Sequence, residues 1–145
     1  MAALRGCDSP FAIAAHAALL RLRGIDFVMR RYSRDPSCNL DVEEARRLSG
    51  AGLRLGALLE SCVGVESLSR RQGLLDGADA LRLARAAGQP PGSAIYFGLG
   101  VGATRADIDG VLHHYQVAPV ARAGAAGDGS RPIPAGRAWG DPWRG

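Results

Sequence analysis

Two acidic residues, Asp8 and Glu60, each stand at the end of a short apolar segment that predicts a β-strand. Two carboxylates on one rim can act as general acid and as general base or nucleophile in glycosidic hydrolysis. If one strand separates theirs, the two backbones lie about 10 Å apart, twice the ~4.8 Å strand spacing and near the upper end of the separation in inverting glycosidases. The alternatives are a helix cap beside Ser9 for Asp8, and a solvated loop acid for Glu60.

A second pair of candidates, Arg31 and Tyr32, ends another predicted strand. The arginine could bind an anion and the tyrosine could stack on a sugar. An arginine at a strand end more often pairs with a neighbouring carboxylate, and structural pairing is the favoured interpretation.

The segment 92–103 carries an apolar strand pattern directly into the alternating glycines Gly98, Gly100 and Gly102. It satisfies the G-x-G-x-x-A variant of a dinucleotide-binding fingerprint. No further strand follows to carry the acidic residue expected about twenty positions later, so the match is weak. A small nucleotide-binding α/β domain stays as an alternative.

Histidines and cysteines give no metal-site pattern. The three cysteines, Cys7, Cys38 and Cys62, lack C-x-x-C spacing, and their odd number excludes complete internal pairing. The histidines, at positions 16, 113 and 114, have no ligand partners at useful spacing. The sequence predicts neither a metal nor a cofactor.

Strand and helix patterns alternate along residues 4–116, and capping residues mark their boundaries. Asp41 with Glu44 and Ser69 with Gln72 are capping-box patterns. Right-handed crossovers make the predicted sheet parallel, with its carboxyl ends at one edge, where ligands bind. The predicted strands are Ala3–Cys7, Ile25–Arg31, Leu53–Leu59 and Ala94–Leu99, and the predicted helices are Ala12–Arg23, Asp41–Ser49, one that Ser69 caps and Gly88 ends, and one from Thr104 to about Tyr115.

The composition predicts one folded domain in 145 residues, with a net charge of +4 from 18 arginines and no lysine. The arginines are scattered, which argues against nucleic-acid binding. No run of about 18 apolar residues and no signal-peptide pattern is visible, so we expect no membrane association and a cytoplasmic protein. Residues 117–145 are rich in Ala, Gly, Pro and Arg and predict a flexible tail, for which out-of-frame translation is one interpretation.

Six short motifs, in order and spacing, resemble the glycoside-hydrolase-like domain of twin-arginine-secreted mycobacterial proteins and of many bacterial and phage cell-wall proteins. That family has a TIM-barrel fold and is distantly similar to family-25 lysozymes. The resemblance covers about residues 4–116. The motifs are Arg5-Gly6-Cys7-Asp8, residues 26–32, residues 40–52, Leu59-Glu60-Ser61, Gly77-Ala78-Asp79-Ala80 and residues 92–97.

The resemblance implies a cell-wall glycan, or peptidoglycan, as partner. It places Asp8 and Glu60 in the sugar-binding cleft as acid and base candidates, with Arg31, Tyr32, Tyr96, Gly100 and Gly102 lining the cleft. The family carries acidic residues where this chain has Gly100 and Gly102, so the predicted function is glycan hydrolysis or, alternatively, non-catalytic glycan binding or another interaction by a remnant.

The predicted fold class is α/β, a partial (β/α)8 barrel. Four βα units were identified, whereas a complete barrel has eight in typically ~250 residues. Pairing of the open edges in a homodimer is one way to cover them.

Overall fold

The computed structural model describes residues 3–61, 64–99 and 102–116 of the chain. Residues 117–145, the predicted tail, lie outside this part, as does Gly100. The described strands are β1 (Gly6–Ser9), β2 (Phe27–Tyr32), β3 (Arg54–Ser61) and β4 (Ile95–Leu99), and the α-helices are α1 (Ala17–Leu22), α2 (Val42–Gly50), α3 (Arg70–Ala86) and α4 (Ile108–Tyr115). Short 3-10 turns cover Ala14–His16, Pro36–Cys38, Val65–Ser67 and Arg105–Asp107.

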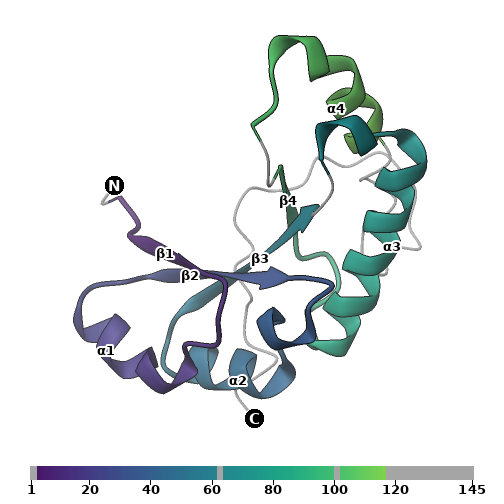
Figure 1. Cartoon of the computed structure of the whole chain (residues 1–145). Helices are drawn as coiled ribbons and strands as arrows, with labels where there is room; N and C mark the ends of the chain where they lie inside the picture. Colours follow the sequence, from purple (N-terminus) through teal and green to yellow (C-terminus); the bar gives the residue numbers. More distant parts are fainter. Residues whose placement is uncertain (1–2, 62–63, 100–101, 117–145) are drawn as a thin grey trace.

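Within the described residues the strands form one parallel sheet in the order β1-β2-β3-β4, as right-handed βα units predict (Figure 1). Strand β2 lies between β1 and β3, which is the arrangement assumed for Asp8 and Glu60. In this part of the chain β1 and β4 each pair with a single neighbour. The homodimer through these edges stays a prediction.

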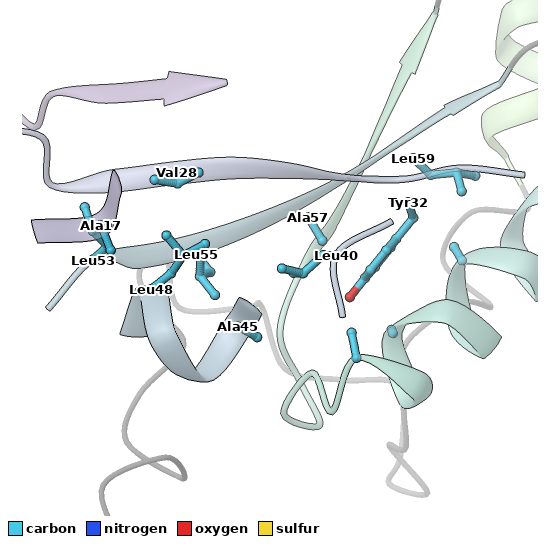
Figure 2. Close-up of a cluster of buried hydrophobic side chains, with 13 residues drawn as sticks. Ala17, Val28, Tyr32, Leu40, Ala45, Leu48, Leu53, Leu55, Ala57 and Leu59 are labelled. Atoms are coloured by element: carbon cyan, nitrogen blue, oxygen red, sulfur yellow. The ribbon is translucent and has the colours of Figure 1, made fainter. Parts of the chain in front are cut away.

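One face of the sheet forms the core with the helices. Val28 and Tyr32 of β2 are fully buried there, and Leu55 and Ala57 of β3 pack beside them. Figure 2 shows Leu55 directed toward Leu48 of α2, whereas the Tyr32 ring leaves the other end of β2 and reaches Gln89, which follows α3. Alternation along each strand therefore sends every second side chain into the core.

The opposite face of the sheet, which we call the inner face, carries the intervening residues. The Phe27 ring lies over Gly6 of the neighbouring strand, and Met29 lies over Gly56, so that a Cβ at either glycine would collide with the larger side chain. Large side chains thus alternate with glycines across neighbouring strands. The inner-face residues are Gly6 and Asp8 of β1, Phe27, Met29 and Arg31 of β2, Arg54, Gly56, Leu58 and Glu60 of β3, and Tyr96 and Gly98 of β4.

The first βα connection differs from the prediction. β1 begins at Gly6 and includes Asp8, so this acid lies within the strand and not after it. The helix begins with the 3-10 turn at Ala14, and Ser9 does not cap it, because the Ser9 hydroxyl bonds to the backbone of Phe11 instead. The Ile13 N–H donates to Glu44, which holds this connection outside the helix.

The second helix begins as predicted, but its capping box is half formed. The Asp41 carboxylate accepts the Glu44 N–H at 2.7 Å and caps α2. The Glu44 side chain turns inward to Arg30. A buried arginine is strongly destabilising without a charged partner. Glu44 therefore pairs with Arg30 and does not complete the capping box with the Asp41 backbone N–H.

Candidate functional site

Arg31 joins the two candidate acids on the inner face. Its Nη2 donates to Asp8 Oδ2 at 3.2 Å, and its Nη1 donates to Glu60 Oε2. The three residues come from β1, β2 and β3, and one guanidinium fills the space between the two acids. The side chains of Asp8, Glu60 and Arg31 are 48%, 31% and 25% exposed, so the group is accessible to a ligand. We call these three residues the acid–arginine cluster.

The cluster is held by a permanent cation. The hydrogen bond to Asp8 raises the pKa of Arg31; the charges of Glu60 and Asp8 add to this, and partial burial opposes it. The guanidinium is accordingly charged across the whole physiological pH range. Its fork of donors explains how one side chain can bind two carboxylates at once.

The arrangement favours binding chemistry in the free protein. Both carboxylates accept hydrogen bonds from the same guanidinium, whereas a general acid must present a proton to its substrate. Carboxylate oxygens and guanidinium N–H groups are together the acceptors and donors that hydroxyl groups need. Hydrolysis would require Asp8 or Glu60 to release Arg31 when substrate binds.

Tyr96 and Gly98 of β4 extend the inner face beside Glu60. Tyr96 pairs in register with Leu58 and is 56% exposed, so its ring is available to a ligand. Gly98 pairs with Glu60, and a Cβ there would approach Leu58 to 3.3 Å and Glu60 to 3.5 Å. A larger residue at this position would therefore press on Leu58 and only touch Glu60. A Cβ added at Gly102 would meet no atom of the described residues within 4 Å.

Tyr32 lies apart from the cluster. Its side chain points to the face of the sheet that packs against the helices, which we call the helical face, and is fully buried there (Figure 2). Its hydroxyl donates to Gln89 Oε1 at 2.8 Å, and burial raises the pKa of Tyr32. Alternation after Arg31 explains the position, because consecutive side chains of a strand leave on opposite faces. The structure thus brings Arg31 to the acids and takes its neighbour Tyr32 into the core.

A polar recess adjoins the cluster between the ends of β2 and β3 and the helix α3. Arg34 Nη2 lies 3.5 Å from Asp76 Oδ1, and Arg34 Nε lies 3.9 Å from Asp79 Oδ2. Arg82 Nη2 lies 3.4 Å from Asp79 Oδ1. Asp79 belongs to one of the six sequence motifs, but the sequence alone indicates no role for these charges. The lining residues are Ser33, Arg34, Leu59, Glu60, Asp76, Asp79, Arg82 and Leu83.

The histidines add no metal site to the described part of the chain. His114 is buried at the α3–α4 contact, with its Nε2 3.3 Å from Asp76 Oδ2. No group of three or more His, Cys, Asp or Glu side chains that could hold a metal ion occurs in the ranges that the structure covers. None of the helices within those ranges has the length and apolar character needed to cross a membrane.

Comparison with known proteins gives a family and a fold. The family described as Rv2525c-like, glycoside hydrolase-like domain matches residues 18–128. Two solved structures of the Tat-secreted protein Rv2525c of Mycobacterium tuberculosis, with HEPES and with L-tartrate, each align with a TM-score of 0.66 and 19% identity. They cover 80% and 81% of this chain. An uncharacterized B. stearothermophilus protein aligns with a TM-score of 0.61, 17% identity and 82% coverage of this chain.

The chain spans 62%, 64% and 57% of the lengths of these three structures. No curated protein gives a significant match. The likeness confirms the predicted α/β fold class of a partial barrel. The expectation of a cytoplasmic protein is wrong by the same comparison, because the mycobacterial protein of this fold is Tat-secreted.

Proposed function

The chain belongs to the family of Rv2525c-like, glycoside hydrolase-like domains, and on this premise we propose that it binds bacterial cell-wall glycan at the acid–arginine cluster. The single observation that carries the proposal is the Arg31 guanidinium shared between Asp8 and Glu60 at the carboxyl edge of the sheet. Ligands of barrel folds bind at that edge. Export, as for the Tat-secreted protein Rv2525c, would bring the cluster to the cell-wall glycan.

The details of the inner face support a sugar ligand. The cluster offers charged acceptors and donors for ring hydroxyls, and charge-assisted hydrogen bonds are about twice as strong as neutral ones. Tyr96 of the adjacent strand β4 presents an exposed ring on the same face, suited to the apolar face of a pyranose. The proposed contacts are therefore Asp8, Arg31, Glu60 and Tyr96.

Hydrolysis is the second candidate, favoured by the position of Asp8 and Glu60 on strands separated by β2. In this proposal the glycan displaces Arg31 from one acid, which takes up a proton from water and donates it to the leaving glycosidic oxygen. The other carboxylate acts as base toward the attacking water or as nucleophile. The resemblance implies acids at the positions of Gly100 and Gly102, and among the described inner-face residues the acids are Asp8 and Glu60.

Calorimetric titration with soluble peptidoglycan chains, run beside an assay for released reducing ends, separates the two candidates. Binding without release supports recognition alone. Release that Glu60→Gln abolishes supports hydrolysis. Wild-type protein that is folded and neither binds nor releases contradicts both. Asp109→Asn, on α4 and away from the cluster, is the matched control and should behave as wild type.

A further inference from the structure

Directly behind the acid–arginine cluster, on the helical face of the sheet, lies a buried ion pair. Arg30 Nε and Nη2 donate to the two carboxylate oxygens of Glu44, each at 2.9 Å. Arg30 is 0% exposed and Glu44 is 5% exposed. The pair therefore joins the middle of β2 to the first turn of α2 inside the protein.

The same two side chains hold the backbone that follows Asp8. Arg30 Nη1 donates to the carbonyl oxygen of Ser9 at 2.8 Å. Glu44 Oε1 also accepts the Ile13 N–H at 2.9 Å. Ser9 is the residue next to Asp8, and Ile13 ends the connection that follows, so both ends of this connection are bonded to one ion pair.

Strand β1 is short and lies at one edge of the described sheet. It has four residues and, in the described part of the chain, pairs with β2 alone. On the inner face Asp8 is bonded to Arg31, and on the helical face Ser9 is bonded to Arg30. Consecutive arginines of β2 thus hold consecutive residues of β1 from the two faces.

We propose that Arg30 and Glu44 are positioning residues, which fix Asp8 at the distance from Arg31 that the acid–arginine cluster requires. They act through Ser9 and Ile13 and do not touch the ligand. Buried ion pairs contribute little net stability, and apolar replacements of similar volume are often neutral or stabilising. Stability and positioning can therefore be separated by experiment.

The inference rests on the proposed glycan site for its effect on affinity, but the order of β1 is measurable without any ligand. The main variant is Arg30→Met combined with Glu44→Leu, which removes both charges and all four hydrogen bonds together. Arg30→Lys is the second variant, because it keeps a charge for Glu44 and loses the fork that reaches Ser9. Tyr32→Phe is the control, since it removes a buried hydrogen bond that does not involve β1.

Amide hydrogen exchange of Cys7, Asp8 and Ser9 is the direct readout. We expect it to accelerate at least about tenfold in the double variant, and less in Arg30→Lys, with α3 unchanged. Tyr32→Phe should leave the exchange of β1 as in wild type. Unchanged exchange of β1 in the double variant, or, if that variant does not fold, in Arg30→Lys, would overturn the proposal.

Affinity for soluble peptidoglycan chains is the second readout. The double variant should lose about tenfold, because the cluster geometry is lost. Asp8→Asn should lose a similar factor, and adding it to the double variant should cost little more, since both act on one interaction. Additive losses would contradict action through Asp8. Faster exchange of β1 with no binding by wild type would reject the glycan site and retain the positioning role.

Discussion

Arg30 and Arg31 are consecutive residues of β2, and their side chains serve opposite faces of the sheet. Arg30 is fully buried against Glu44, and Arg31 lies on the inner face between Asp8 and Glu60. The alternation of a β-strand dictates this division. Two consecutive residues therefore connect the packing of α2 on one face with the arrangement of Asp8 and Glu60 on the other.

Replacing Arg31 by lysine should weaken glycan binding without weakening the fold. One ammonium cannot reproduce two hydrogen bonds to Asp8 and Glu60, so we expect about a tenfold loss of affinity. The free energy of unfolding should change by less than about 1 kcal/mol, because partly exposed ion pairs contribute little. Calorimetric titration and urea denaturation measure the two effects. Arg82→Lys, in an exposed pair with Asp79, is the control; equal losses in both variants would contradict the prediction.

Removing the hydroxyl of Tyr32 should have the opposite effect. Tyr32→Phe leaves the buried Oε1 of Gln89 without its donor and should cost about 1–3 kcal/mol in the free energy of unfolding. Glycan affinity should stay within twofold of wild type, as expected for a residue in the core. Tyr96→Ala, on the inner face, should lower the affinity instead. A Tyr32→Phe protein that is as stable as wild type but binds glycan poorly would contradict this account and assign Tyr32 a role in binding.

The thiol of Cys7 reports the charge of Asp8. Burial raises the pKa of Cys7, and the neighbouring Asp8 charge raises it further. Only the thiolate is nucleophilic, so alkylation at neutral pH should be slow. Asp8→Asn removes the charge, lowers the pKa of Cys7 and should speed alkylation by iodoacetamide.

The alkylation experiment is done with Cys38 and Cys62 replaced by serine, so that one thiol reacts. Glu43→Gln changes an exposed charge on α2 and serves as the control. A Cys7 rate that responds equally to both substitutions would show that Asp8 has no specific effect.

The contribution of Asp26 to the stability of the fold should disappear in acid. The Arg5 N–H bonds to its carboxylate at 3.0 Å and, with Arg21, lowers the pKa of Asp26 below the ordinary 3.8. A group whose folded pKa is depressed stabilises the fold above its unfolded pKa, and this contribution is lost as the pH falls through the folded pKa. Urea denaturation should therefore show a larger deficit for Asp26→Asn at about pH 5 than at about pH 2. A deficit that does not shrink in acid would contradict this account.

Local patterns predicted the elements well, and long-range contacts decided the rest. The residues that bound the helices are visible in the sequence: Asp41 caps the beginning of α2, and Gly24, with a positive φ, follows the end of α1. The pairing of Glu44 with Arg30 joins residues fourteen positions apart, and a capping pattern gives no sign of it. The adjacent residues Arg31 and Tyr32 are both predicted to line the site, although alternation along the strand sends their side chains to opposite faces of the sheet. The sequence places Glu60 and Asp8 at one edge and favours pairing of Arg31 with a neighbouring carboxylate, which the structure shows. That one guanidinium binds both acids appears only in three dimensions.

Co-sedimentation with purified peptidoglycan sacculi measures whether the acid–arginine cluster binds cell-wall glycan. Wild-type protein should sediment with the sacculi in a saturable way. The folded Asp8→Asn, Glu60→Gln double variant should need at least about tenfold more sacculi for half-maximal binding, because both charged acceptors are lost. Equal sedimentation of the two proteins, or none by wild type, would contradict the claim.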